Sequence, residues 1–338
     1  MSAIAHKRHA WQPIGTAVTR FRSLWATLML CLLPAPALAW NFAGHRLTAC
    51  IAWDQLPASS QEKVSQLLRE HPDYARWTRK AGKNAPDRAA FIEASIWADL
   101  IRHDPRFHDA SEAATPLQPG FPDMDKHRDW HYVNRPLTGY SATRSGEGEH
   151  TGQLDTRLEV LTATLGSQET SERAAMNRSY ALPWLIHLVA DAHQPLHVID
   201  ADAAWDAPQG DLKLLDPSAP RKRTTSLHAF WDDLPGPSGL SGKKLDAACR
   251  ALTAMYPPPR PSSPAQWIDE SWQIARTAGF PADYSQERRI SKAFFGNAKE
   301  IANQRIVAAG YRLADVLRKH LSVCFEIDVW IILRDERA

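Results

Sequence analysis

The stretch HLVADAHQPLH, residues 187–197, places three histidines and one aspartate within eleven positions. The run before it carries apolar residues at helical spacing, and the proline of QPLH is expected to stop that helix or bend it sharply. At about 100° per residue, Asp191 lies only about 40° around the helix from His187, whereas His193 falls nearly opposite Asp191. His197 follows the proline and is free to turn back. The stretch therefore offers His187, Asp191 and His197 to one place and leaves His193 out.

Helical periodicity extends over most of the chain beyond residue 40. Segments with apolar residues three and four positions apart are residues 45–56, 60–71, 87–102, 155–165, 174–193, 265–279 and 298–321. The joints between them are rich in proline and glycine, and no alternation of strands with helices suggests a parallel sheet. We therefore predict a single compact all-α domain over residues 40–321. The alternating apolar residues of 322–338 predict an added edge strand or an irregular extension.

The first 39 residues have the composition of a secretory signal peptide. They contain four basic residues and no acidic one, and they end in the apolar run LWATLMLCLLPAPALA with a small-x-small site at Ala39. An uncleaved membrane anchor is the alternative, but the apolar run is shorter than the ~20 residues that a spanning helix needs. No later segment is expected to span a membrane. The expected mature chain begins at Trp40 and is secreted or periplasmic.

Charge and cysteine content narrow the possible functions. Cleavage after residue 39 leaves 36 Lys and Arg against 38 Asp and Glu, a net charge of about −2. This balance argues against a protein that holds polyanions through broad surface charge, so a phosphate ester would have to be attracted locally. Cys50, Cys249 and Cys324 remain, and an odd number permits at most one intramolecular disulfide. Cys50 lies on an apolar helix face and is expected to be a buried thiol.

The histidine and aspartate pairing recurs in the segment SLHAFWDDL. His228 and Asp232 are four residues apart on one helical face, as His187 and Asp191 are. Imidazole nitrogen and carboxylate oxygen are ligands that zinc accepts, and one rigid helix can supply two of them. A lone pair at this spacing is more often a surface salt bridge, but both pairs are flanked by Trp, Leu or Val. Burying so many ionisable groups without a cation would cost several kcal/mol each.

The same motifs carry a resemblance to the zinc-dependent single-strand-specific nucleases, the fungal and plant family of nuclease S-one and nuclease P-one. The resembling motifs, in order from Trp40 to about Leu321, are WNFAGH, WAD at 97–99, HYVN where the family often has HFID, HLVADAHQPLH and LHAFWD. The resemblance implies three Zn²⁺ ions in a helical fold shared with zinc-dependent phospholipases C. Carried over position by position, the ligands of the first zinc are Asp99, His131, His187 and Asp191; those of the second are His197, His228 and Asp232; and those of the third are Trp40, His45 and the bridging Asp191.

The implied activity is hydrolysis of single-stranded DNA and RNA to 5′-phosphorylated products, with 3′-nucleotides as further substrates. A hydroxide shared by the zinc ions that Asp191 bridges would attack phosphorus in line, so no protein side chain need act as general base. Tyr132 would be the platform on which a base stacks, although an ordinary core tyrosine is an equal alternative. Asn134 stands where HFID has an aspartate, and an amide donates as well as accepts hydrogen bonds.

Two other functions stay open at this point. A zinc-dependent phospholipase C would resemble the same fold, but that family has a glutamate where this chain has Asp232, and its first histidine lies further from the terminal tryptophan than His45 does. A non-catalytic zinc-binding protein would normally close each site with four protein ligands. The second zinc is implied to have three, which favours catalysis. Nothing in the sequence demands more than a monomer.

Overall fold

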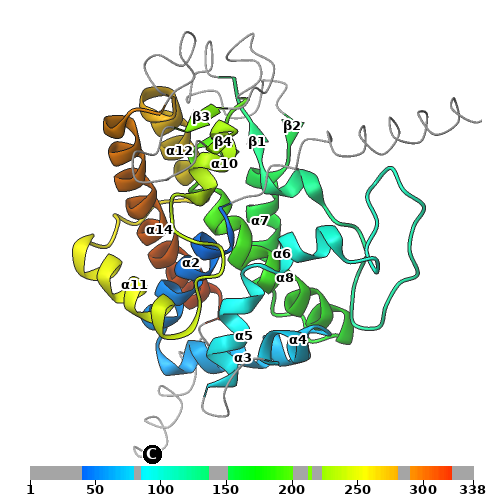
Figure 1. Ribbon diagram of the computed structural model, residues 1–338. Helices are drawn as coiled ribbons and strands as arrows, with labels where there is room; N and C mark the ends of the chain where they lie inside the picture. Colours follow the sequence, from blue (N-terminus) through cyan, green and yellow to red (C-terminus); the bar gives the residue numbers. More distant parts are fainter. Residues whose placement is uncertain are drawn as a thin grey trace, which may run out of the picture. The chain divides into compact units, whose positions relative to one another are not determined.

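The computed structural model describes residues 40–79, 85–136, 151–200, 212–214, 223–280 and 290–321. This part of the chain is mainly helical, and its strands form two antiparallel pairs, β1 with β2 and β3 with β4 (Figure 1). The predicted all-α class is confirmed. Among the described helices, none combines the length and the apolar character that a membrane span requires. The predicted signal peptide, residues 1–39, and the predicted extension, residues 322–338, lie outside the described residues.

Short helices and strands precede and follow a few long helices along the chain. In order, the elements are α2 (Phe42–Gln55), α3 (Ala58–Glu70), α4 (Tyr74–Thr78), α5 (Pro86–Ala94), α6 (Trp97–Leu100), η1 (Ile101–His103), η2 (Arg128–His131), β1 (Val133–Asn134), β2 (Thr151–Gly152), α7 (Leu154–Leu165), α8 (Glu172–Asp191), η3 (Pro195–His197), β3 (Leu212–Leu214), β4 (Arg223–Thr225), α10 (Leu227–Asp233), α11 (Gly242–Met255), α12 (Pro264–Ala278) and α14 (Lys292–Leu321).

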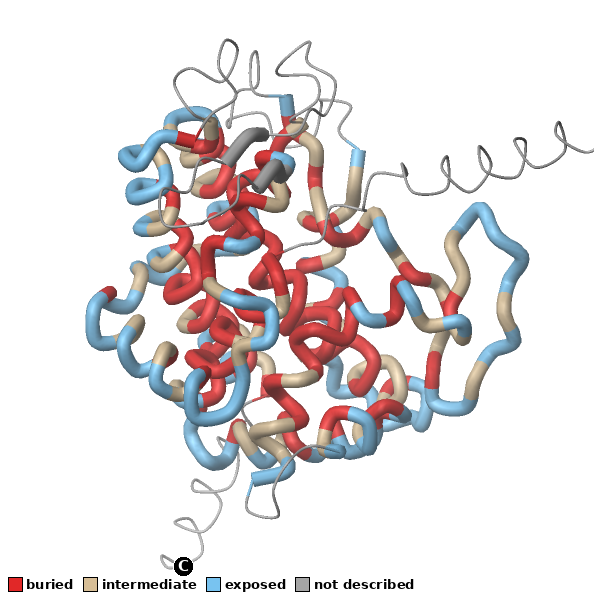
Figure 2. The backbone as a smooth tube through the Cα atoms, in the orientation of Figure 1, coloured by how far each residue is buried: buried red, intermediate tan, exposed pale blue. Residues whose placement is uncertain are grey.

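Helix α8 forms the centre of the core. Every residue from Ser179 to Asp191 is buried, and α2, α3, α5, α6, α7 and α14 all contact this helix (Figure 2). A helix that is apolar on all sides is stable only when other elements surround it. The helix begins at the Ser171 cap, whose side chain accepts a hydrogen bond from the backbone N–H of Ala174. It ends at Asp191, and η3 begins at Pro195, as the proline predicts. His187 and Asp191 thus lie in the middle of the protein.

Helix α2 is held against the long helix α14 by a close backbone approach. A Cβ atom added at Gly310 would lie 2.6 Å from Cβ of Ile51 and 3.1 Å from the carbonyl oxygen of Thr48. Only glycine permits this approach without displacing α2. The position of α2 matters because this helix carries His45 and starts two residues after Trp40.

The predicted helix over 87–102 is interrupted in the structure. Helix α5 ends at Ala94, and α6 and η1 follow after a turn at Ser95 and Ile96. The carbonyl oxygen of Ser95 accepts a hydrogen bond from Nδ1 of His187, 2.7 Å away. At this turn the carbonyl oxygen of Ser95 binds the central helix α8. The spacing of apolar residues in the sequence could not reveal this long-range contact. Helix α11 was not predicted either, although Leu245, Cys249 and Leu252 repeat at the helical spacing of three and four residues.

Candidate metal centre

Eight of the nine predicted metal ligands come together as side chains in three groups. Within each group the ligand atoms lie within 4.8 Å of one another. The groups are His45, Asp99 and His187; His131, His187 and Asp191; and His197, His228 and Asp232. The ninth, Trp40, was predicted to bind through main-chain atoms, which these side-chain groups do not include. The segments that supply them are α2, α6, η2, α8, η3 and α10, which are far apart in sequence.

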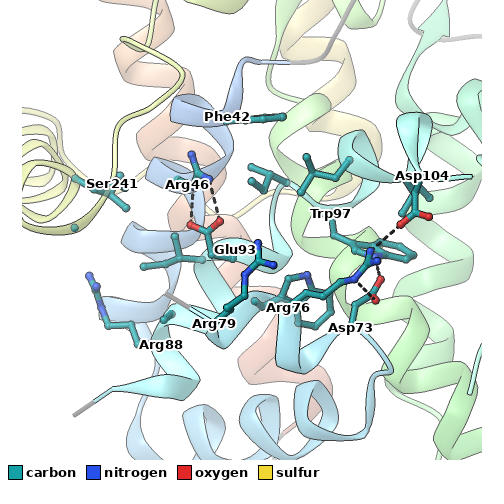
Figure 3. A pocket seen from close by; sticks show the side chains of 18 of the residues that line it. Phe42, Arg46, Asp73, Arg76, Arg79, Arg88, Glu93, Trp97, Asp104 and Ser241 are labelled. Atoms are coloured by element: carbon teal, nitrogen blue, oxygen red, sulfur yellow. Dashed lines mark hydrogen bonds and ion pairs between the residues drawn. The ribbon is translucent and has the colours of Figure 1, made fainter. Parts of the chain in front are cut away.

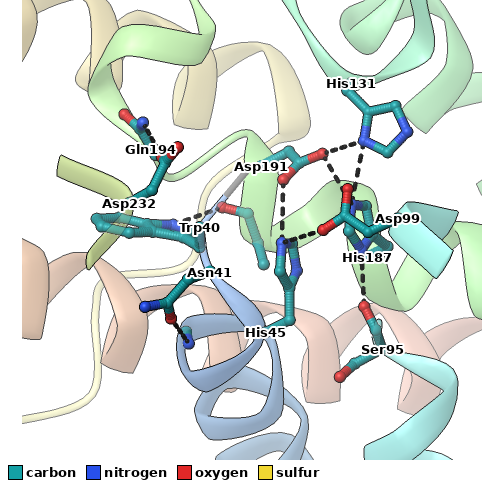
Figure 4. Close-up of polar contacts among 12 residues, drawn as sticks. Trp40, Asn41, His45, Ser95, Asp99, His131, His187, Asp191, Gln194 and Asp232 are labelled. Atoms are coloured by element: carbon teal, nitrogen blue, oxygen red, sulfur yellow. Dashed lines mark hydrogen bonds and ion pairs between the residues drawn. The ribbon is translucent and has the colours of Figure 1, made fainter. Parts of the chain in front are cut away.

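Asp191 is the hub of the cluster (Figure 4). Its Oδ2 lies 3.1 Å from Nδ1 of His131 and 3.3 Å from Nε2 of His187. Its Oδ1 lies 3.5 Å from Nε2 of His45 and 3.8 Å from Nδ1 of His197. A single carboxylate thus faces four imidazoles, each from a different element. The geometry agrees with the bridging position that the resemblance implies for Asp191, without testing what it binds.

Several polar atoms of this cluster are buried without a hydrogen-bond partner among the described residues. They are Nδ1 and Nε2 of His45, both carboxylate oxygens of Asp99, Nε2 of His131 and Oδ1 of Asp191. An unsatisfied buried polar group costs about 1–3 kcal/mol, so six in one place demand an explanation. A bound cation supplies it, because imidazole nitrogens and carboxylate oxygens all donate electron pairs to a metal. The residues present fit a zinc cluster.

The ionisation of these side chains supports the same interpretation. Burial lowers the pKa of His45 and of His131 well below the usual value, which leaves both imidazoles neutral and able to bind a metal. Burial raises the pKa of Asp191 to about 6. For His187, burial lowers the pKa, but the carboxylates of Asp191 and Asp99 outweigh it and raise the value. These carboxylates attract positive charge: the buried guanidinium of Arg102 lies 3.5 Å from Oδ1 of Asp99, and a proton on His187 or a metal cation would add to it.

The third group lies beside the first two and is closer to solvent. Nε2 of His197 is 2.9 Å from Nε2 of His228, and that nitrogen is 3.7 Å from Oδ2 of Asp232. Nδ1 of His197 donates to the carbonyl oxygen of His131, 2.8 Å away, so Nε2 of the neutral ring carries the lone pair. The side chain of His228 is 26% exposed, whereas those of His197 and Asp232 are buried. A ligand from solvent would therefore meet this group first.

Trp40 packs against the elements that carry the cluster. Its indole Nε1 donates to the carbonyl oxygen of Ala190, 3.1 Å away and one residue before Asp191. The next residue, Asn41, donates from its backbone N–H to the carbonyl oxygen of Asp232 at 3.1 Å. A Cβ atom added at Gly44 would lie 2.7 Å from Cβ of Trp40, so glycine leaves the space for this side chain. The residue expected to become the amino terminus is thus fixed beside the metal ligands.

The structure also places the two residues predicted to touch substrate. Tyr132 directly follows His131 and is partly exposed, and Asn134 belongs to β1. The amide nitrogen of Asn134 donates to Oγ1 of Thr151 on β2, 2.9 Å away. Their roles toward a base stay predictions.

Similarity to known proteins extends over almost the whole described chain. The model of the S1/P1 nuclease family matches residues 40–322. The chain belongs to the S1/P1 nuclease family. Endonuclease 1 of Arabidopsis thaliana is 25% identical, over 90% of this chain and 94% of that protein. Endonuclease 2 and Endonuclease 4 of the same plant are 23% and 24% identical, over 85% and 87% of this chain and 93% of each relative. The chain is therefore a nuclease, and nucleic acid is its substrate class.

Sequence reasoning missed three residues that hold the predicted metal ligands, or the segments that carry them, in place. Gln194 donates to Oδ1 of Asp232 at 2.8 Å, and Ser95 accepts from His187. Asn41 caps α2 and donates to Oδ1 of Asp233 at 3.0 Å. An asparagine immediately before a helix is a recognisable cap signal, and it could have identified Asn41. Nothing local in the sequence marks Ser95 or Gln194, since each acts on a distant residue.

His193 belongs to none of the three candidate metal groups. Its ring hydrogen bonds connect the turn after α8 to other parts of the core. Its Nδ1 is 2.7 Å from the carbonyl oxygen of Val189, and its Nε2 is 2.9 Å from Nη1 of Arg312 on α14. The two guanidinium nitrogens of Arg312 also contact Glu270 on α12, at 2.6 and 2.7 Å. This buried network ties the turn that carries Asp191 and His197 to two further helices.

We expect Arg312→Met to lower the free energy of unfolding by about 1–3 kcal/mol, because it removes the buried guanidinium, which pairs with the partly exposed Glu270, and leaves Nε2 of His193 without its contact. Urea denaturation measures the loss. Arg318→Met is the matched control, since Arg318 lies on the same helix and pairs with Asp315 where both side chains are 45–47% exposed. The control should change the free energy of unfolding by less than about 1 kcal/mol. Equal effects of both substitutions would contradict a structural role for the network.

A separate cavity is lined by residues of α2, α4, α5, α6 and α11 (Figure 3). It is rich in arginine, but the charges are largely paired. Arg46 contacts Glu93 through two bonds of 2.9 Å, and Arg106 contacts Asp73 and Asp104 at 2.8 Å. None of the predicted metal ligands lines this cavity.

Proposed function

We propose that this nuclease is a zinc-dependent phosphodiesterase that cleaves single-stranded DNA and RNA to 5′-phosphorylated products and also acts on 3′-nucleotides. The observation that carries the proposal is the cluster around Asp191. Buried imidazoles and carboxylates converge there, and six of their nitrogen and oxygen atoms have no hydrogen-bond partner among the described residues. Family membership supports the reaction class, and the names of the Arabidopsis relatives describe endonucleases. We propose that three Zn²⁺ ions are held by the nine ligands that the resemblance implies.

The chain's own residues prepare the site for this chemistry. Zinc in these positions supplies Lewis acidity toward the phosphate and lowers the pKa of bound water. Ser95 fixes the ring of His187, the carbonyl oxygen of His131 fixes that of His197, and Gln194 orients Asp232. Such outer contacts set the tautomer and direction of each ligand before substrate arrives. The partial exposure of His228 gives the phosphate its approach to the cluster, while the side chains of the other two groups are shielded from bulk solvent.

Export is the second part of the proposal. We infer that the chain is processed after Ala39 and secreted or periplasmic, because a free amine at Trp40 is needed for ligation through that atom. The contacts of Trp40 and Asn41 with Ala190 and Asp232 support this assignment, since they hold the new terminus at the cluster. The family match also begins at residue 40. Processing would keep the enzyme incomplete until it has left the cytoplasm.

A substrate comparison tests the reaction. The exported protein should release acid-soluble nucleotides from heat-denatured DNA and RNA much faster than from duplex DNA, because bases in a duplex are stacked away from a pocket. Chelation should abolish release, and zinc should restore it. Release of phosphocholine from lecithin in place of nucleotides would support the phospholipase alternative, and zinc binding without either activity would support a storage role. Both results would contradict the proposal.

A variant at Asn134 tests base recognition. We expect Asn134→Asp to discriminate more strongly among the four homopolymers than the native chain, because a carboxylate only accepts hydrogen bonds whereas an amide also donates. The amide nitrogen now faces Thr151, whose hydroxyl can donate to a carboxylate and keep the side chain in place. Initial cleavage rates on the homopolymers give the comparison, with Asn177→Asp as a control outside the site. Identical relative rates for native and Asn134→Asp proteins would refute it.

A further inference from the structure

A second cluster of reactive side chains lies away from the metal centre, where α11 packs on α2. Cys50 of α2 and Cys249 of α11 are both buried, with 0% and 1% of their surface exposed. Their sulfur atoms and a carboxylate oxygen of Asp54 lie within 4.8 Å of one another. The two cysteines are 199 positions apart in the sequence, so only the fold brings them together. None of the predicted zinc ligands belongs to this cluster.

We propose that Cys50 and Cys249 form a disulfide bond in the exported protein. The proposal rests on the export part of the proposed function, because disulfides persist in oxidising compartments and not in the cytosol. It does not depend on zinc or on nuclease activity. Cys324, which lies outside the described residues, is left as the odd thiol.

The surroundings of Cys50 favour thiol exchange over metal binding. Nη2 of Arg88 lies 3.2 Å from the sulfur of Cys50 and 3.5 Å from Oδ1 of Asp54. This guanidinium places a positive charge beside Cys50 and Asp54, two of the three side chains that would have to bind a metal ion. The cluster therefore favours a bond between the sulfurs over a soft-metal site.

A disulfide would stabilise the attachment of helix α11 more than that of any other element, because α11 has few buried residues of its own. Only Leu245 and Cys249 of its fourteen residues are buried. Its ion pair with α5, Asp246 to Arg88 at 3.0 Å, is partly exposed on both sides and contributes little. A disulfide would close a loop of about 200 residues and restrict the unfolded chain accordingly. It would also join α11 to the helix that starts beside Trp40 and carries His45.

The oxidant is a protein or small-molecule disulfide, and the reaction balances as two exchanges. The Cys50 thiolate attacks one sulfur of the oxidant, which forms a mixed disulfide and releases one thiol. The Cys249 thiolate then attacks the Cys50 sulfur, which forms the internal bond and releases the second thiol. The two cysteines lose two electrons and two protons, and the oxidant gains them. Because both sulfurs are buried, the bond is formed during folding and is then shielded from reductants.

The test maps thiols in the protein secreted through its own leader and alkylated without reductant. The expected result is one alkylated cysteine per chain, Cys324, and a cross-linked peptide containing Cys50 and Cys249 that separates on reduction. Protein made reduced in the cytosol and refolded with oxidised glutathione should give the same peptide. This second arm tests the pairing independently of export, and neither arm reads nuclease activity.

Variants complete the test. Cys50→Ser and Cys249→Ser should each lower Tm by about 5 to 15 °C relative to the oxidised protein, and the double variant should lower it no further. Cys324→Ser is the matched control and should leave Tm unchanged. Alkylation of both Cys50 and Cys249 after secretion and after glutathione treatment would overturn the proposal. So would a bond to Cys324, or thiols that become reactive only when a chelator removes a bound metal.

Discussion

Asp191→Asn should lose nuclease activity by a factor on the order of 10³ or more, together with bound zinc, because the variant keeps the shape of the side chain and removes its charge. Asp191 faces four imidazoles at 3.1–3.8 Å, which is more imidazoles than Asp99 or Asp232 faces. An amide cannot bridge two cations as a carboxylate does. The measurements are kcat on denatured DNA and zinc content per chain after dialysis.

The control for this prediction is Asp269→Asn. Asp269 pairs with Arg135 at 2.7 Å, its side chain is 38% exposed, and it belongs to none of the three metal groups. This variant should keep its zinc and most of its activity, which separates loss of the hub from a general effect of removing one carboxylate. An Asp191→Asn protein that retained both zinc and activity would contradict the central role of Asp191.

A chain that begins one residue early, at Ala39, should hold one zinc fewer and lose activity at least about 100-fold relative to a chain that begins at Trp40. The extra peptide bond converts the α-amine of Trp40 into an amide, which has no lone pair to give a metal. Zinc content and cleavage of denatured DNA, measured on both chains, provide the comparison.

Trp40→Phe, made in the chain that begins at residue 40, is the matched control for this second prediction. It keeps the terminal amine and the backbone carbonyl, and it removes part of the buried ring together with the hydrogen bond from the indole to the carbonyl oxygen of Ala190. We expect full zinc content and a loss of about 1–3 kcal/mol in the free energy of unfolding. Equal zinc content in the chains beginning at 39 and 40 would show that the amine is not a ligand.

The parts of the structure that could be predicted from sequence are those fixed by local periodicity. The apolar residues before His187 predict a buried helix, and the proline at 195 predicts its end near Asp191; α8 and η3 follow this pattern. The fixed angle between successive side chains then brings His187 and Asp191 together, and for this pair no long-range information is needed. His193 lies in the turn after α8 and points away from the cluster toward Arg312, as the same angle predicted.

The parts that could not be predicted depend on contacts between distant segments. At the break between α5 and α6, the carbonyl oxygen of Ser95 accepts a hydrogen bond from His187, which is 92 residues away in the sequence. The pairing of Cys50 with Cys249 and the support of Asp232 by Gln194 join residues whose neighbours in sequence give no sign of the partner. The resemblance, rather than periodicity, brought His45, Asp99 and His131 into the proposed ligand set.

The measurement that tests the central claim most directly is zinc content together with amino-terminal sequencing on one sample of the exported, active protein. We predict a chain that starts at Trp40, carries three zinc ions and loses both metal and single-strand nuclease activity on chelation. A terminus at any other residue in a fully active enzyme, or undiminished cleavage of denatured DNA after the zinc has been removed, would contradict it.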